Sequence, residues 1–343
     1  MKTVYTSRHR LHGTDQIWVE GERFECKEVP QRAEVILTAV EAAHLGEVVP
    51  PIDHGLRPIL AVHDADYVDY LRTAFRSYSA YVGRPTPVLA ERTSVDPSRA
   101  PTRPAAFPEL RDYYTYDYED PIVAETWEAA YWSAQTALTA AKIVAGGERT
   151  AYALCRPPGH HAMPGQYGGF CYLNNAAVAA RALSKDGRVA ILDLDYHHGN
   201  GTQAIFYEDP SVLYVSLHAD PQLDYPYYWG YADEVGSGPG AGTNVNLPLP
   251  IGASDDEYLG ALEVALEHIM AFGPKALVLS LGADAVSGDP IGKFRLTVRA
   301  WAAVARRVAG LGYPTIVVQE GGYDLSSLGS RVVTFLLAFA EHG

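Results

Sequence analysis

The sequence predicts an α/β fold in which a central parallel sheet is covered by helices on both faces. Five apolar runs have the length of buried strands and are continuously hydrophobic, as expected where helices cover both faces of a sheet: 150–155, 189–194, 212–217, 276–281 and 315–319. Helical stretches lie between or beside them: 127–145, 175–184, 255–272, 295–310 and 326–341. Because no repeat or long linker interrupts this alternation, we expect one domain over residues 1–343.

One segment, about residues 76–125, departs from this rhythm. It contains seven prolines and six tyrosines, and Glu109 to Asp120 within it are acidic. So many prolines are poorly compatible with long helices or central strands, whereas the tyrosines argue against disorder. We interpret the segment as an ordered loop excursion that packs on another protein surface, such as that of a second subunit.

The charge balance disfavours two classes of partner. Lys and Arg number 27 against 41 Asp and Glu, a formal net charge of -14. Nucleic acids and anionic membranes are bound by clustered basic residues, so we expect neither as a partner. The acidic balance would favour a cationic substrate, although acidity that serves only solubility explains it equally well.

The remaining composition is that of a soluble globular protein. Hydrophobic residues make up 48% and charged residues 20%. The three cysteines have no paired spacing, so they do not indicate a disulfide framework or a cysteine-ligated metal. No signal-peptide-like start and no 18-residue apolar run are present. We therefore expect a cytoplasmic location.

Polar residues follow the predicted strands at their carboxyl ends. Strand 189–194 runs into DYHHGNG, strand 150–155 into RPPGHH and strand 315–319 into EGGY, while His218 and Asp284 follow the other two strands. Ligands of open α/β sheets bind outside the carboxyl ends of the strands, where such loops converge. We therefore expect one shared site.

Asp195, His197 and Asp284 are the candidate metal ligands. A spacing of two at a strand end directs Asp195 and His197 to the same side of the chain, and Asp284 arrives from another strand. Three protein ligands leave a position open for water or substrate. Zn²⁺ suits this set, and Fe²⁺, Co²⁺ or Mn²⁺ are alternatives. A weaker interpretation is that Asp193 and Asp195 only cap a following helix.

Three further side chains could supply acid–base and polarising chemistry. The tandem His160-His161 could accept and deliver a proton, provided that partners fix the tautomers. Tyr323 follows two glycines and could donate a hydrogen bond to an oxyanion. Each motif alone is also compatible with ordinary structural histidines and a partly buried tyrosine.

Taken together, these motifs resemble the histone deacetylase superfamily, and most closely its bacterial acetylpolyamine amidohydrolase branch. The matching stretches occur in the family order over about half of the chain: CRPPGHHA (155–162), GGFCYLNNAAVAA (168–180), ILDLDYHHGNGTQ (191–203), SLHADP (216–221), LSLGADA (279–285) and EGGYD (320–324). The resemblance implies the arginase–deacetylase fold, a parallel sheet flanked by helices on both faces, and hydrolysis of an acetyl amide.

The resemblance also implies roles for single residues. Asp195, His197 and Asp284 match the zinc ligands, and His161 matches the general base. The remaining catalytic matches are His160, its acidic partner Asp193, the His161 partner Asn200, and the carbonyl-polarising Tyr323. Phe170 and Tyr225 match the aromatic walls of the acyl-chain channel, where Tyr225 is commonly Phe, and Ile291 is also assigned to substrate binding.

Structural potassium is implied as well. Asp193, Asp195, His197 and Leu217, with the hydroxyl of Ser216, match one monovalent-cation site. A second site would lie near Phe206, Asp209, Val212 and Thr243.

Substrate size and oligomeric state are expected from the 76–125 excursion. It matches in position a loop that builds a homodimer and narrows the active site in the amidohydrolase branch, and Glu109 and Glu119 are candidates to bind the ammonium groups of a small cationic acetylated amine. An acidic residue expected near the N-terminus is replaced by Ile17, and Asp15 or Glu20 could substitute only with altered geometry.

The leading hypothesis is therefore a zinc-dependent deacetylase acting on acetylpolyamines. Deacetylation of acetyl-lysine in proteins or peptides is the first alternative. A two-manganese ureohydrolase of the same fold would need further Asp or His ligands, and a non-catalytic metal-binding regulatory protein would be expected to lack one of the residues above.

Overall fold

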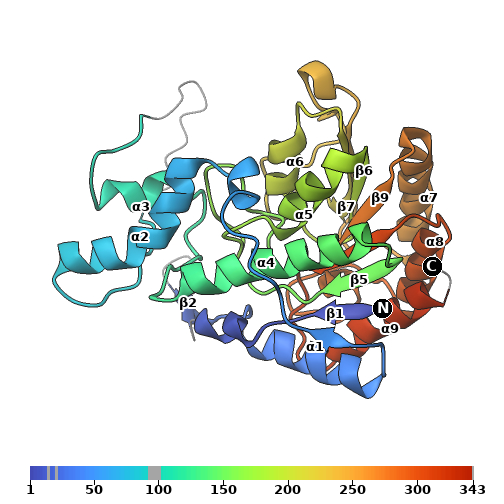
Figure 1. Ribbon diagram of the computed structural model, residues 1–343, viewed down its shortest axis with the longest axis horizontal. Coiled ribbons are helices and arrows are strands. Elements are labelled where there is room, and N and C mark those ends of the chain that lie inside the picture. Colours follow the sequence, from blue (N-terminus) through green and yellow to red (C-terminus); the bar gives the residue numbers. More distant parts are fainter. Residues whose placement is uncertain (14–15, 20–21, 92–101, 342–343) are drawn as a thin grey trace.

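Eight parallel strands form the central sheet of the computed structural model, in the order β4-β1-β5-β10-β9-β6-β7-β8 (Figure 1). The structure describes residues 1–13, 16–19, 22–91 and 102–341, without the side chains of 16–19 and 22–24. The strands are β1 (Lys2–Val4), β4 (Val48–Val49), β5 (Thr150–Ala153), β6 (Val189–Asp193), β7 (Val212–Ala219), β8 (Asn244–Leu249), β9 (Ala276–Leu281) and β10 (Thr315–Gln319). A separate antiparallel hairpin joins β2 (Gln16–Val19) and β3 (Glu22–Glu25).

Helices cover both faces of the sheet, as the continuous hydrophobicity of the strands predicts. One apolar core contains residues of α1 (Gln31–Ala42), α7 (Asp255–Phe272), α8 (Val298–Ala309) and α9 (Leu328–Ala340). The other contains residues of α2 (Ala65–Val82), α4 (Thr126–Ala145) and α5 (Asn175–Leu183). Strand β6 shows why two cores form, because Leu192 packs into the first and its neighbour Ile191 into the second. The predicted fold class is confirmed.

Three of the predicted helix starts have side-chain caps. Asn174 accepts a hydrogen bond from the backbone N–H of Ala177 at α5, and Ser254 forms a capping box with Glu257 at α7. Thr297 caps α8. The helix expected from residue 295 therefore begins three residues later, because Leu296 still bridges to the segment after β9.

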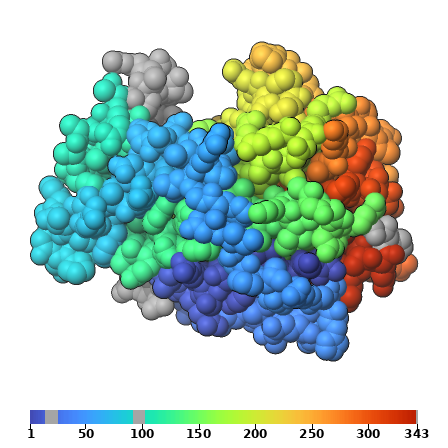
Figure 2. Space-filling model, in the orientation of Figure 1, coloured from blue at the N-terminus to red at the C-terminus, as the bar shows by residue number. Residues whose placement is uncertain are grey.

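The expected loop excursion is shorter than 76–125. Residues 76–82 are the last part of α2, and the short helix α3 (Glu109–Tyr113) lies within the segment. Tyr114 packs on α2, with its ring stacked 4.4 Å from that of Tyr70, and Arg111 donates to the hydroxyl of Tyr78. Figure 2 shows α2 and the following described residues projecting at one end of the molecule.

Several boundaries and elements differ from the sequence expectation. Strand β7 extends to Ala219, so His218 lies inside the strand rather than after it, and β5 and β6 end at Ala153 and Asp193. The sequence interpretation missed β1, β4, β8, the hairpin, α1, α2 and α6 (Asn200–Phe206). The short strands carry too few residues to show a pattern. Among the described helices, none is long and apolar enough to cross a membrane.

Candidate active site

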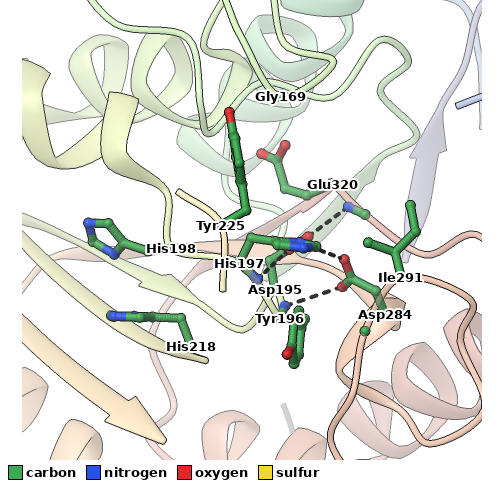
Figure 3. A network of polar contacts seen from close by, with 12 residues as sticks. Gly169, Asp195, Tyr196, His197, His198, His218, Tyr225, Asp284, Ile291 and Glu320 are labelled. Atoms are coloured by element: carbon green, nitrogen blue, oxygen red, sulfur yellow. Dashed lines mark hydrogen bonds and ion pairs between the residues drawn. The ribbon is translucent and has the colours of Figure 1, made fainter. Parts of the chain in front are cut away.

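The two carboxylates and the imidazole proposed as metal ligands converge at the carboxyl edge of the sheet (Figure 3). Asp195 and His197 follow β6, and Asp284 lies in a single 3-10 turn, Ala283–Ala285, after the neighbouring strand β9. One ligand atom from each lies within 4.8 Å of the others. Nδ1 of His197 is 3.3 Å from both Asp195 Oδ1 and Asp284 Oδ2. All three residues are buried.

This donor set fits a divalent metal ion. Asp284 Oδ2 is buried and accepts no hydrogen bond, and burial together with the Asp195 carboxylate raises the pKa of Asp284 to about 7. An ion would balance the two buried carboxylates. Backbone N–H groups hold the remaining oxygens, from Gly321 to Asp195 Oδ2 (2.8 Å) and from Tyr196 to Asp284 Oδ1 (3.2 Å). Oxygen and imidazole ligands of this kind suit zinc and its neighbours.

The tandem histidines occupy two different electrostatic environments. Nδ1 of His160 is 3.0 Å from Asp193 Oδ2. Burial opposes a positive charge on His160, but the carboxylates of Asp193 and Asp195 outweigh it and raise the pKa of His160 to about 10. His161 donates from Nδ1 to Oδ1 of Asn200 (2.7 Å), the first residue of α6. Burial, then His160 and His197, hold the pKa of His161 well below its usual value. The carboxylate partners thus favour the charged form of His160, whereas burial and the neighbouring imidazoles favour the neutral form of His161, whose Nε2 is free of the Asn200 bond.

A buried carboxylate that the sequence interpretation left without a role holds the histidine turn. Glu320, directly after β10, accepts the backbone N–H groups of Gly159 (2.6 Å) and His160 (3.2 Å) at Oε2. Burial raises its pKa to about 7. The EGGY motif therefore positions the histidines as well as carrying Tyr323.

Tyr323 lies on a loop clamped by Asp289. One oxygen of Asp289 accepts the N–H groups of Tyr323 (2.7 Å) and Asp324 (3.2 Å), and the other accepts those of Ile291 (3.0 Å) and Gly292 (3.4 Å). One carboxylate thus joins the loop of Tyr323 to that of Ile291, which lies beside Asp284 in Figure 3.

The phenol of Tyr323 remains protonated. Burial raises its pKa well above the usual value, although Arg32 opposes the shift. The guanidinium of Arg32 lies 4.5 Å from the ring centroid, donates to the carbonyls of Glu320 and Gly322 (2.6 Å each), and pairs with the buried Glu28 (2.9 Å). The sequence interpretation did not identify this support beneath Tyr323.

Two aromatic side chains stand beside these groups as the resemblance implies. The ring of Phe170 is 5.9 Å from that of Tyr323, and the ring of Tyr225 is 5.0 Å from that of His161 and nearly perpendicular to it. Gly169 directly precedes Phe170, and a side chain there would clash with the His161 ring and crowd the Tyr225 hydroxyl. Its positive φ of 57° also favours glycine.

The acidic segment 117–120 holds both walls. Asp117 Oδ2 accepts the hydroxyl of Tyr225 (3.0 Å) and the N–H of Gly169 (3.2 Å). Asp120 Oδ1 accepts the N–H of Phe170 (2.6 Å), while its buried Oδ2 accepts no hydrogen bond. Neither residue was singled out from sequence, because an acidic stretch alone does not show which carboxylates face the site.

The two glutamates proposed for ammonium binding lie in different places. Glu119 is half-buried beside Asp117, and burial, then Asp117, raises its pKa to about 7. Glu109 is exposed at the first residue of α3, and no described contact joins it to the site. Ile17 lies in β2, but its side chain and residues Asp15 and Glu20 lie outside the described part of the chain.

The residues of the two proposed monovalent-cation sites are neighbours in the structure. Asp193 pairs in register with Ser216 across β6 and β7, next to Leu217, and the Asp195 N–H bonds Asp193 Oδ1 (3.2 Å). Around the second site, the Asp209 N–H bonds the Phe206 carbonyl (3.0 Å), Thr243 Oγ1 lies 3.4 Å from the Asp209 carbonyl, and Val212 begins β7.

Comparison with known proteins agrees with this geometry. The sequence profile of the histone deacetylase domain matches residues 26–339. The chain belongs to the histone deacetylase domain family. The resemblance drawn from the motifs is thereby confirmed at the family level.

Curated relatives and a solved structure are similar over nearly the whole chain. Acetylpolyamine amidohydrolase 1 of Pseudomonas aeruginosa is 45% identical over 99% of both chains. The acetylpolyamine amidohydrolase of Mycoplana ramosa is 42% identical over 99% of this chain and 100% of its own. The crystal structure of acetylpolyamine aminohydrolase from Burkholderia pseudomallei superposes with a TM-score of 0.93 at 41% identity, covering 99% of this chain and 98% of that one.

Proposed function

We propose that this protein is a zinc-dependent deacetylase that removes acetyl groups from acetylated primary amines, most of all acetylpolyamines. The observation that carries the proposal is the convergence of the Asp195–His197–Asp284 set with His161 and Tyr323 at one sheet edge. The similarity to several acetylpolyamine amidohydrolases over the full chain supports the substrate class.

Each polar side chain has a part in amide hydrolysis. Zinc held by the three ligands would polarise the acetyl carbonyl and acidify a water molecule. His161 takes the proton of the attacking water at Nε2 and later delivers it to the departing amine, with its tautomer set by Asn200. The Tyr323 hydroxyl donates to the developing oxyanion. His160, paired with Asp193, keeps a positive charge close to the negative charge that develops.

Substrate recognition follows from the acids beside the channel. Glu119 is half-buried and Asp120 is buried with one oxygen unpaired, and burial together with Asp117 raises the pKa of both carboxyl groups. An ammonium group beside them would favour their ionised forms and pair with the resulting carboxylates. We assign Phe170 and Tyr225 to the walls around the methylene chain, Ile291 to the side nearest Asp284, and Glu119 to the substrate ammonium; Glu109, although exposed, remains a candidate.

The chemistry is tested with the full-length, zinc-loaded enzyme and acetylputrescine. We expect acetate release that a chelator abolishes and zinc restores. Tyr323→Phe should lower kcat by about a hundredfold, because one oxyanion donor is lost, while bound zinc, measured by mass spectrometry, stays at the wild-type level. Release that survives chelation, or that Tyr323→Phe leaves undiminished, would contradict the mechanism.

The substrate class is tested by comparing kcat/KM for acetylputrescine, acetylcadaverine, acetylspermidine and an acetyl-lysine peptide. We expect the polyamines to exceed the peptide. If the peptide exceeds them by more than about tenfold, the protein is a peptide deacetylase and the role given to the acids is wrong.

Four finer properties belong to the same proposal. The family resemblance supports structural K⁺ at the two proposed monovalent-cation sites. It also supports a homodimer built with the segment that follows α2, and a cytoplasmic location. Fe²⁺ or Co²⁺ could replace zinc at the metal site. Elemental analysis of the dialysed protein measures the bound ions. Light scattering measures the molar mass in solution, and a monomeric mass would contradict the dimer.

A further inference from the structure

Tyr225 is the residue at which the catalytic groups and the acidic segment meet. Its ring lies nearly perpendicular to those of His161 and His197, with centroids 5.0 Å and 6.1 Å away. In Figure 3 the ring extends from beside His197 and ends, at its hydroxyl, toward Gly169. That hydroxyl bonds Asp117 Oδ2 (3.0 Å). A single side chain thus spans from the reacting centre to an acid.

A second phenol lies close to this hydroxyl. The Tyr225 hydroxyl lies 3.5 Å from the hydroxyl of Tyr116, which donates to the carbonyl oxygen of His161 (2.9 Å). Burial raises the pKa of Tyr225 well above its usual value, so the phenol stays a donor to Asp117 at neutral pH. A phenylalanine at this position would keep the ring and lose this link.

Asp117 is immobilised by four donors. Besides Tyr225 and the Gly169 N–H at Oδ2, its Oδ1 accepts the N–H groups of Tyr118 (2.7 Å) and Glu119 (3.3 Å). All four lone-pair positions of the carboxylate are therefore occupied. Three of the donors are backbone groups of the loops themselves, and Tyr225 supplies the one side-chain donor among them.

This arrangement fixes where the charge of the acidic segment lies relative to the channel. Asp117 binds Tyr225 and Gly169, and Asp120 binds the N–H of Phe170, so both channel walls are fastened to residues 117–120. A rigid carboxylate discriminates a cation from a neutral group better than a mobile one, because less ordering is needed on binding.

We propose that Tyr225 is a specificity-determining residue whose hydroxyl holds Asp117 and the adjoining Glu119 against the channel wall, so that the enzyme prefers a cationic over a neutral acetylated amine of equal length. The inference rests on the proposed deacetylase function and concerns its selectivity. The ring of Tyr225 contacts the methylene chain of the substrate, and its hydroxyl fixes the position of the carboxylates at the far end of that chain.

The test compares two amides that differ only at the far end of the chain. Acetylputrescine ends in an ammonium group, and N-pentylacetamide carries a methyl group in its place. The ratio of their kcat/KM values is measured for wild type, Tyr225→Phe, Asp117→Asn and the double variant, all zinc-loaded. Tyr228→Phe, which removes an exposed hydroxyl from the same loop, is the matched control.

We expect Tyr225→Phe to lower the ratio about fivefold, as the loss of one hydrogen bond to a charged acceptor allows. In the Asp117→Asn background the same change should alter the ratio by less than about twofold, because its partner is gone. Tyr228→Phe should keep the wild-type ratio.

Two outcomes overturn the proposal while the deacetylase function stands. One is an unchanged ratio in Tyr225→Phe, and the other is an equal fall with and without Asp117. A wild type that hydrolyses both amides equally contradicts the cationic substrate class, and an inactive wild type contradicts the chemistry itself. In both of these last cases the specificity role of Tyr225 is overturned with it, since there is no preference to set.

Discussion

At the scale of single residues, the hydrogen-bond partners give two identical buried side chains different roles. His160 and His161 are adjacent, yet one faces the carboxylate of Asp193 and the other the amide of Asn200. A charged partner raises the pKa of the first to about 10, and a neutral partner cannot offset the burial of the second. The tandem motif showed that chemistry was present, but only the partners divide the roles.

Glu119 yields a prediction at this scale. Its folded pKa of about 7 lies above its unfolded value, because burial penalises the charge. As pH rises from the unfolded pKa to about 7, Glu119 ionises in the unfolded state but stays largely neutral in the folded state. The unfolded state is thereby favoured, and the wild type loses stability. Glu119→Gln should therefore be more stable than wild type above pH 7, by roughly 1 kcal/mol after allowance for solvent screening.

The difference between the two proteins should vanish as pH falls well below the unfolded pKa of 4.5, where both states carry the neutral acid. Urea unfolding at several pH values measures it, and Glu109→Gln, at an exposed position, is the matched control. A stability difference that is the same at pH 4.5 and pH 8 would show that Glu119 is not desolvated.

At the scale of elements, the site depends on carboxylates that join loops from different strands. Asp289 ties the loop after β9 to the loop after β10 through four N–H groups. Glu320 ties the end of β10 to the histidine turn after β5. The sheet order makes these bridges possible, because β10 lies between β5 and β9.

Replacing Asp289 by Asn should misplace Tyr323. The amide NH₂ of Asn would face two of the four N–H donors, which lose their acceptor. We expect kcat for acetylputrescine to fall about tenfold with a smaller change in KM, because Tyr323 acts on the transition state. Asp324→Asn, which removes a carboxylate bonded to Ser326 and Ser327, is the control and should keep kcat. A lower melting temperature with unchanged kcat would make Asp289 purely structural.

At the scale of the whole molecule, the metal site adds a cost that an ion would relieve. Asp195 and Asp284 bring two carboxylates into the buried end of the sheet, where burial and then the repulsion from Asp195 raise the pKa of Asp284 to about 7. An ion that binds only the folded chain stabilises it by mass action.

Metal removal should therefore destabilise the protein. We expect the melting temperature to fall by ~5 °C when the zinc-loaded enzyme is treated with excess chelator, measured by differential scanning calorimetry. Asp284→Asn, which lacks one ligand, should show little response to the same treatment. An equal melting temperature for wild type with and without chelator would mean that these residues do not hold a metal in solution.

The sequence by itself determined the fold class and the chemistry-bearing motifs of this protein. Short continuous apolar runs predict buried strands in a covered sheet, and polar residues at their ends are expected to meet where parallel strands end. That reasoning predicts that Asp195, His197 and Asp284 lie together, and the structure brings them together.

Tertiary structure alone decided the supporting partners. Asp117, Asp289, Glu320 and Arg32 act on residues 34 to 290 positions away, through backbone groups whose direction no local pattern encodes. The extent of α2 and the short edge strands were also decided there, because packing against distant elements overrides weak local signals. Residue types thus specify which chemistry is available, and long-range contacts specify how each group is held and charged.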